Sequence, residues 1–274
     1  MLKPSDDPRA ICRDLLANGK LIPFVGSGMS ARFGFPSWKG LVDIIAEELD
    51  WDADVFSLSG NYLQLAEYYQ ATKGSIGPLR SRLDKIFTAP DDMIKSSRAH
   101  EALVALNFPL IYTTNYEDMI ERAFLLHASK YQKRCHTISS IDNFQDIDAD
   151  AVQLIKFHGT FSDDDSLVIT ESQYFERLEF ESPLDLKLRA DMLGKTLLFL
   201  GYSFSDLNVR LMLYKLMKLR RLHKRPNTTP IAIMTGSSFT PIQRELLSRW
   251  EVAVIELDPV DRVKGLDDFL ESLQ

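Results

Sequence analysis

The chain has 274 residues, of which 45% are hydrophobic, and its formal net charge is -7. This length supports one sizeable core, so we expect a single domain over 1–274, and the acidic balance argues against direct nucleic-acid binding, which needs a basic surface. Two cysteines, Cys12 and Cys135, cannot build a four-cysteine zinc site, and no apolar run approaches a membrane span, so we expect a cytoplasmic protein without membrane contact.

Six short apolar runs recur along the chain and are predicted to be β-strands. Their length, their β-branched residues and their lack of polar alternation are typical of strands that are covered on both faces. The runs are 21–25, 109–113, 152–157, 196–200, 230–234 and 252–257. Stretches of helical period, such as 37–49 and 205–221, lie between them. This alternation predicts an α/β fold with a parallel sheet and helices on both faces.

The stretch 40–105 departs from this alternation because it holds no convincing strand. Within it, 61–70 and 77–87 have helical character, so we interpret 40–105 as a helical insert between the first two strands. The insert is rich in aromatic residues, which are enriched at interface cores, but packing onto the sheet would explain each of them equally well. The residues concerned are Trp51, Phe56, Leu58, Tyr62, Leu65, Tyr68 and Tyr69.

Four loops that follow predicted strands carry unusual residues. In order they are "GSGMSARFGFPSW" at 26–38, "TNYED" at 114–118, "HGTFS" at 158–162 and "GYSFSD" at 201–206. In a doubly wound sheet, ligands bind where loops leave the carboxyl ends of the strands. The convergence of four such loops therefore predicts a ligand crevice at that edge of the sheet.

The first loop fits a phosphate-binding pattern. Gly26, Gly28 and Ala31 match G-x-G-x-x-A directly after a strand, where backbone amides and a helix N-terminus meet a pyrophosphate. A tight turn without a ligand explains the same pattern. A dehydrogenase would also need an acid about 20 residues further on, at the end of a second strand. The acids at that spacing lie within a helical pattern, which disfavours hydride transfer and leaves phosphate binding open.

The second and third loops carry candidate catalytic side chains. Asn115 lies between a strand and a helix predicted from 116, so it could be an N-cap, a functional residue or both. Glu117 and Asp118 would then occupy the first helical turn, where acids interact favourably with the helix dipole. His158 ends a strand and is followed by Gly159, which allows close backbone approach; it could be structural or an acid–base group.

Together and in this order, the four loops resemble those of the sirtuin family. "VGSGMSARFGFPSW" is similar to the family's GAG-x-S loop and the G-[IF]-P-x-[FW] element after it, and "TTNYE" is similar to the T-Q-N-x-D segment. "FHG" matches the strand-end His-Gly, and "GYSFSDLN" is similar to the late G-[TY]-S loop. The resemblance covers about 20–210 and implies an NAD site on a Rossmann-like sheet.

The resemblance also implies roles for individual residues. Asn115 and His158 would be the catalytic pair: Asn115 would orient a water or a ribose hydroxyl, and a neutral His158 would accept a hydroxyl proton. The implied NAD contacts are Gly26, Ser27, Gly28 and Ser30 at the pyrophosphate, Phe35 in the element that follows, Glu117 and Asp118 near the nicotinamide, and Gly201, Tyr202 and Ser203 at the adenosine half.

Two departures separate this sequence from the sirtuin deacylases. Those enzymes carry a four-cysteine zinc module, which this chain cannot form, and their Asp two residues after the catalytic Asn is Glu117 here. Sirtuin-like proteins of bacterial anti-phage systems also lack the zinc module and hydrolyse NAD. They often work with a partner such as an ATPase or a nucleotide-recognising protein, and this sequence resembles them more closely.

Three functions remain in competition at this point. The first is an NAD glycohydrolase without a metal that depletes NAD during phage infection and is gated by self-assembly into a homo-oligomer and by an activator protein. The second is protein deacylation or ADP-ribosylation, which the missing zinc module disfavours. The third is a non-catalytic NAD-sensing or scaffold subunit, in which Asn115 and His158 are only structural.

Overall fold

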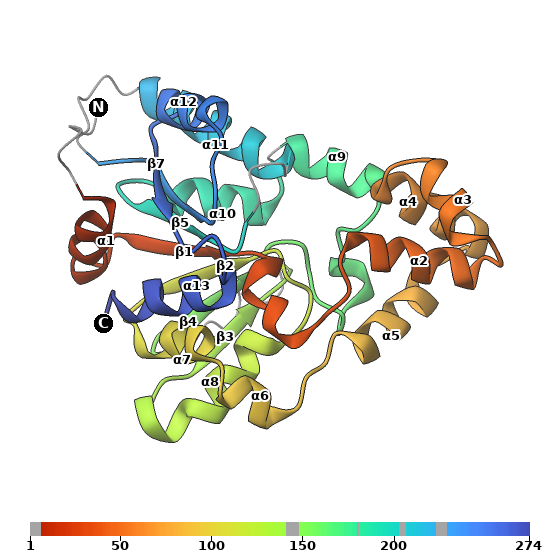
Figure 1. Ribbon diagram of the computed structural model, residues 1–274, viewed down its shortest axis with the longest axis horizontal. Helices are drawn as coiled ribbons and strands as arrows, with labels where there is room; N and C mark the ends of the chain where they lie inside the picture. The colour runs from red at the N-terminus through yellow and green to blue at the C-terminus, as the bar shows by residue number, and fades with distance from the viewer. Residues whose placement is uncertain (1–6, 141–147, 180, 203–206, 223–228) are drawn as a thin grey trace.

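In the computed structural model, residues 7–140, 148–179, 181–202, 207–222 and 229–274 are described. Seven parallel strands form one sheet in the order β3-β4-β2-β1-β5-β6-β7, with helices on both faces (Figure 1). The predicted Rossmann-like α/β fold is confirmed. The strands are β1 Leu21–Val25, β2 Leu110–Thr113, β3 Cys135–Ile138, β4 Val152–Lys156, β5 Thr196–Leu200, β6 Ala232–Gly236 and β7 Val252–Glu256.

Six of these strands coincide with the predicted runs to within two residues at either end, whereas β3 was not predicted. Its sequence, "CHTI", has no apolar run, and only Ile138 is buried. The strand lies at the edge of the sheet and pairs with β4 alone, from Cys135 opposite Val152 to Ile138 opposite Ile155. An edge strand that is covered so little does not need the apolar pattern of a central strand.

Alternate residues of the strands supply two separate cores. Leu21 and Val25 of β1 belong to one cluster, whereas Ile22 and Phe24 belong to the other. The first cluster is covered by α1 Pro8–Ala17, α6 Asp91–Lys95, α7 Arg98–Ala105, α8 Met119–Tyr131 and α13 Arg262–Glu271, and the second by α10 Pro183–Asp191, α11 Leu207–Leu222 and α12 Pro241–Arg249. None of the described helices is long and apolar enough to cross a membrane.

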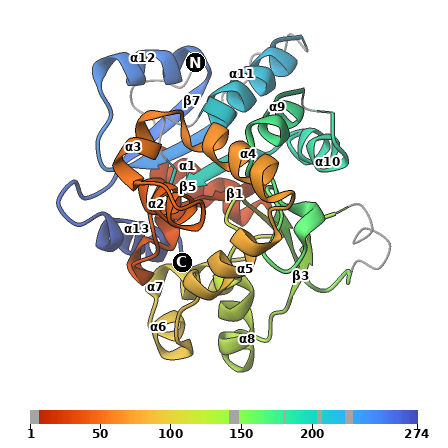
Figure 2. The same cartoon turned by 90° about the vertical axis from the view of Figure 1, so that its right-hand side faces the viewer.

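Helices also fill the segment between β1 and β2. The helices α2 Trp38–Glu48, α3 Ala53–Leu58, α4 Tyr62–Lys73 and α5 Gly77–Ile86 form a third core, and α4 contacts α9 Glu171–Glu179. They lie beyond the carboxyl ends of the strands, at the right of Figure 1 and in front of the sheet in Figure 2. The boundaries of the insert, 40–105, stay a prediction.

The aromatic residues of this segment divide between core and surface. Phe56, Leu65 and Tyr69 are buried in the third core, so packing explains them. Tyr62 is partly buried against the same core. The side chains that remain as candidate contact surface are Trp51 at 43% exposure, Leu58 at 88% and Tyr68 at 45%.

The loops after β1 and β5 are in direct backbone contact. The N–H of Gly28 donates to the main-chain oxygen of Gly201 at 3.0 Å. Gly201 has φ +70°, and a Cβ there would lie 2.5 Å from the main-chain nitrogen of Met29. A Cβ on Gly28 would in turn lie 2.8 Å from the Gly201 backbone. Glycine is therefore required on both sides of this contact.

Replacement of Gly201 by alanine should be far more destabilising than replacement of Gly194. Both glycines have positive φ, but a Cβ on Gly194 meets nothing within 4 Å. Gly194→Ala should lower the free energy of unfolding by about 1 kcal/mol, from backbone strain alone. Gly201→Ala should lower it by about 3 kcal/mol, because overpacking is added to the strain. Urea denaturation of both variants measures the difference, and equal losses would refute the steric explanation.

Candidate functional site

A buried polar cluster lies where β1 and β2 end. The side-chain nitrogen Nδ2 of Asn115 donates to Glu117 Oε1 at 3.0 Å and to Gly26 O and Ser30 Oγ, each at 3.3 Å. The Ser30 hydroxyl donates to the same Glu117 oxygen. All three side chains belong to buried residues. Gly26 and Ser30 of the first predicted loop are thus in contact with Asn115 and Glu117 of the second.

The prediction that a helix begins directly after Asn115 is wrong by three residues. Helix α8 begins at Met119 with Asp118 as its N-cap residue. Asn115 cannot cap it, because the Asn115 amide is directed at Ser30 and Glu117. Glu117 also precedes the helix and faces the cluster. The Asp118 side chain is 60% exposed, outside the cluster, and its ion-pair contact is with Arg122 at 3.9 Å.

The glycine loop forms two short 3-10 turns, Ser27–Met29 and Ala31–Phe33, in place of the α-helix of the dinucleotide pattern. The N–H groups of Gly26 and Gly28 donate to main-chain oxygens at the end of β5, at 2.9 and 3.0 Å. The N–H of Ser30 closes a turn onto Ser27 at 3.1 Å. A phosphate at this loop would need other donors, and the pyrophosphate role of these four residues stays a prediction.

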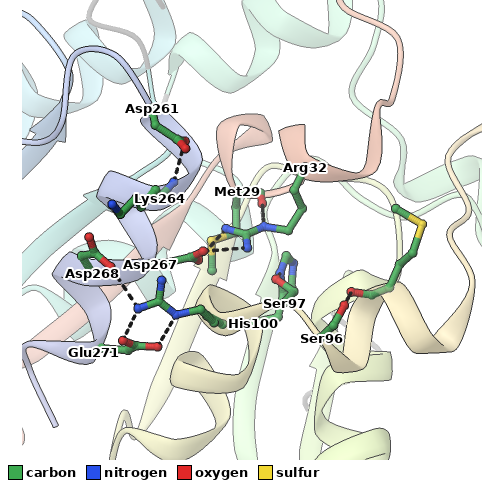
Figure 3. Close-up of polar contacts among 12 residues, drawn as sticks. Met29, Arg32, Ser96, Ser97, His100, Asp261, Lys264, Asp267, Asp268 and Glu271 are labelled. Carbon is green, nitrogen blue, oxygen red and sulfur yellow. Dashed lines mark hydrogen bonds and ion pairs between the residues drawn. The ribbon is translucent and has the colours of Figure 1, made fainter.

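The glycine loop is fixed to α13. Arg32 donates to both carboxylate oxygens of Asp267 on α13, at 2.7 and 3.2 Å, and this ion pair is largely buried (Figure 3). The Arg32 guanidinium also donates to the main-chain oxygen of Met29 at 3.5 Å. The next residue, Phe33, packs against the ring of His100 on α7, with centroids 5.2 Å apart. Two helices that cover the same face of the sheet, α13 and α7, therefore fix the position of the loop.

Phe35 begins a row of aromatic rings. Its ring lies 5.6 Å from that of Phe33 and 5.2 Å from that of Phe87, and Phe87 lies 5.7 Å from Phe161. Tyr116 closes the row at 5.3 Å from Phe161. The row ends at a cavity of about 450 Å³ lined by Asp84, Phe87, Thr88, Tyr116, Glu117, Asp118, Glu121, Thr137, Ser139, Thr160, Phe161 and Ser162.

Tyr202 packs beneath the loops after β1 and β2. Its hydroxyl lies 2.6 Å from Thr114 Oγ1 and 3.3 Å from the main-chain oxygen of Val25, and its ring lies 5.5 Å from that of Phe24. These contacts give Tyr202 a structural role. Ser203 lies outside the described residues. The adenosine contacts of Gly201, Tyr202 and Ser203 stay predictions.

His158 is 4% exposed and lies at the same level of the sheet as Asn115. Thr113 of β2 pairs with Lys156 of β4, so Asn115 and His158 each follow a paired residue by two positions. Burial, with a smaller contribution from the Arg177 guanidinium, lowers the His158 pKa to about 3. The ring is thus neutral near pH 7, and no side chain or backbone group of the described residues hydrogen-bonds to its nitrogens.

Gly159 is explained by a neighbouring turn. Its φ is +82°, and a Cβ would lie 2.1 Å from the main-chain oxygen of Ser166. The main-chain oxygen of His158 accepts from the N–H of Val168 at 3.0 Å. The segment after β4 therefore folds back tightly onto the His158 backbone.

Lys156 was not singled out from the sequence. Its side chain is fully buried, and its Nζ donates to the main-chain oxygen of Glu117 at 2.5 Å. A lysine within the apolar run "VQLIKF" was the available signal, because an unpaired ammonium is costly to bury. Arg177 was also missed: it donates to the main-chain oxygen of Phe157 and lies over that ring, 4.4 Å from its centroid.

The described residues contain no cluster of three or more potential metal ligands. Cys12 and Cys135 are free thiols. Burial raises the pKa of each thiol to about 12.

The chain belongs to the SIR2-like domain family, whose family model matches residues 109–255. Among curated relatives, "NAD(+) hydrolase ThsA" of Acinetobacter baumannii is 31% identical over 218 residues, which is 79% of this chain and 42% of that protein. The protein of the same name from Enterococcus faecium is 27% identical, with coverages of 95% and 56%. "Defense-associated sirtuin 2" of Bacillus subtilis is 29% identical, with coverages of 85% and 22%. The chain thus matches less than two thirds of each relative's length.

The low pKa of His158 should make the fold sensitive to acid. Between the unfolded value of 6.5 and the folded value of about 3, the unfolded chain binds the extra proton, so the free energy of unfolding must fall as pH falls through this window. Each such histidine contributes about 1.4 kcal/mol per pH unit. Denaturation at pH 7 and pH 5 should show a smaller acid loss in His158→Gln, by about 2 kcal/mol. Equal losses would contradict the buried neutral ring.

Proposed function

We propose that this chain is an NAD glycohydrolase that cleaves NAD to nicotinamide and ADP-ribose. The observation that carries the proposal is the buried Ser30–Asn115–Glu117 cluster at the end of β2, with neutral His158 at the end of the adjacent β4. Several relatives bear the name NAD(+) hydrolase, which supports the same activity. The proposed NAD contacts are those inferred from the sequence.

The chemistry of the reaction needs positioning more than acid catalysis. Nicotinamide leaves as a neutral ring, and the ribose carbon develops oxocarbenium character, as in glycoside cleavage. The Asn115 Nδ2 is occupied by Ser30, Glu117 and Gly26, and Oδ1 accepts no hydrogen bond from the described residues. Oδ1 is therefore the atom that orients a water or a ribose hydroxyl. The neutral His158 ring accepts a hydrogen bond from that hydroxyl and takes its proton as the ribose cation forms, since the low pKa of the buried ring makes it a weak base in the free protein.

The cluster supports a role for Glu117 in place of the shorter acid of the sirtuin motif. Its Oε1 accepts hydrogen bonds from Ser30 and from Asn115, so the carboxylate fixes the orientation of the Asn115 amide. Glu117 lies in the lining of the cavity beyond β2, where its carboxylate would favour a cationic substrate. NAD carries such a charge on its nicotinamide ring.

Loss of either proposed catalytic side chain should abolish most turnover. Asn115→Ala and His158→Ala should each reduce NAD hydrolysis by about 100-fold, the loss expected for a positioned acid–base group. Asn18→Ala is a matched control, because Asn18 is an exposed asparagine that follows α1 and bonds only to Asp14 among the described side-chain contacts. If either variant folds and hydrolyses NAD at the wild-type rate, the catalytic role proposed for that residue is wrong.

The products distinguish the competing functions. Hydrolysis releases nicotinamide and ADP-ribose in equal amounts, protein modification consumes NAD only when an acceptor protein is present, and a sensor consumes none. Chromatography of both products, with and without a chelator, tests the reaction and its proposed independence of metal together. Activity that disappears with the chelator would refute the metal-free proposal.

We further propose that the activity depletes cytoplasmic NAD in anti-phage defence and is gated by homo-oligomer formation and by an activator protein, an ATPase or a nucleotide-recognising protein. The name of the Bacillus subtilis relative supports a role in defence. The exposed patch of Trp51, Val55, Leu58 and Tyr68 supports a contact surface, because large apolar side chains are concentrated there.

Light scattering and turnover assays test this gating. The chain should form an oligomer, and Leu58→Asp in the exposed patch should weaken assembly, because it places a charge in an apolar interface. Val260→Asp, at 92% exposure on another surface, is the control. NAD turnover should rise when the product of a neighbouring gene is added. A monomer with full turnover alone would defeat the proposal.

A further inference from the structure

The side chain of Lys156, the last residue of β4, is fully buried. An ammonium group is costly to bury unless it is paired and hydrogen-bonded. Its Nζ donates to the main-chain oxygen of Glu117 at 2.5 Å and lies 3.2 Å from Glu121 Oε1 on α8. These two partners explain why a lysine is tolerated in this strand.

The bond to Glu117 differs from an ordinary ion pair, because its acceptor belongs to the segment that carries the polar cluster. The Glu117 carboxylate accepts hydrogen bonds from Ser30 and Asn115, while its main-chain oxygen accepts one from Lys156. Lys156 also precedes His158 by two residues. One side chain therefore connects the backbones on which both proposed catalytic groups sit, across two adjacent strands.

Other contacts also connect these segments: the N–H of Phe157 donates to the main-chain oxygen of Thr113 and the Tyr116 hydroxyl donates to that of Val168, each at 2.7 Å. The main-chain oxygen of Tyr116 accepts from the N–H of Phe161 and from the hydroxyl of Thr160, both at 3.4 Å. Those contacts act on Thr113 and Tyr116, whereas the Lys156 ammonium is bonded to the main-chain oxygen of Glu117 itself, and charged donors form shorter and stronger hydrogen bonds than neutral ones.

We propose that Lys156 is a positioning residue that fixes the main chain of 115–118 relative to His158, so that the Asn115 amide and the His158 ring address the same substrate. The expected effect of Lys156 on turnover rests on the proposed NAD hydrolysis. Its restraint on the main chain of 115–118 does not depend on that function. If Lys156 served only to neutralise Glu121, the main-chain contact to Glu117 would be incidental.

Hydrogen exchange tests whether Lys156 restrains the main chain of 115–118, independently of activity. Lys156→Met should speed amide exchange in 114–118 by about 10-fold or more, as expected when a restraint on a local segment is lost, with α13 unchanged. Glu121→Gln, which removes the ion-pair partner and leaves the Glu117 oxygen, should stay within about twofold in 114–118. Unchanged exchange in Lys156→Met, or equal increases in both variants, would overturn the proposal.

A second variant covers a failure to fold. Lys156→Gln keeps a polar group at the site but is too short to reach the same oxygen, and it should show the same faster exchange in 114–118. If both variants leave 114–118 protected like the wild type, the proposal is wrong.

Kinetics test whether the hold matters for the reaction. Lys156→Met should lower kcat by about 10- to 100-fold, because small misplacement of reacting groups has that effect, with KM within about threefold. In an Asn115→Ala background the same change should cost no more than about twofold, since the group that it positions is gone. Additive losses would contradict positioning through Asn115. If the wild-type protein releases no nicotinamide, the proposed function fails, and hydrogen exchange alone decides the role of Lys156.

Discussion

The contact between Gly28 and Gly201 is the constraint on which the site depends. Because β1 and β5 are adjacent, their following loops must leave the sheet side by side, and the two backbones approach to within a hydrogen bond. With no room for a Cβ on either side, the first loop turns away through two 3-10 turns. That path brings Ser30 to the end of β2, where it meets Asn115 and Glu117.

Around this contact, some polar side chains keep hydrogen-bonding capacity that the described residues do not use. Asn115 has its NH₂ group occupied, whereas its oxygen and the His158 nitrogens receive no bond from the described part of the chain. This unused capacity lies at one edge of the sheet, where the proposed ligand would complete the network. The desolvation that lowers the His158 pKa also keeps that ring neutral for this purpose.

The sheet and most of its strands were predictable because buried parallel strands have apolar sequences. β3 was missed, since an edge strand with one buried residue has no such signal. The loops were predictable as a group, but the glycine pattern had two explanations, and the steric contact with Gly201 accounts for Gly28 without a phosphate. The partners of Asn115 and the long-range bond of Lys156 join segments far apart in the sequence, and local pattern does not encode such pairs.

The ion pair between Arg32 and Asp267 sets an order on the folding steps of this chain. The two residues are 235 positions apart, so the glycine loop leaves the ribosome long before the helix that anchors it. A nascent chain that has not yet added α13 would leave the Arg32 guanidinium without its carboxylate and the α7 side chains that pack against α13 uncovered. The position of the glycine loop is therefore fixed only after residues 262–271 have been added, and the contact of Ser30 with Asn115 and Glu117 depends on that later step.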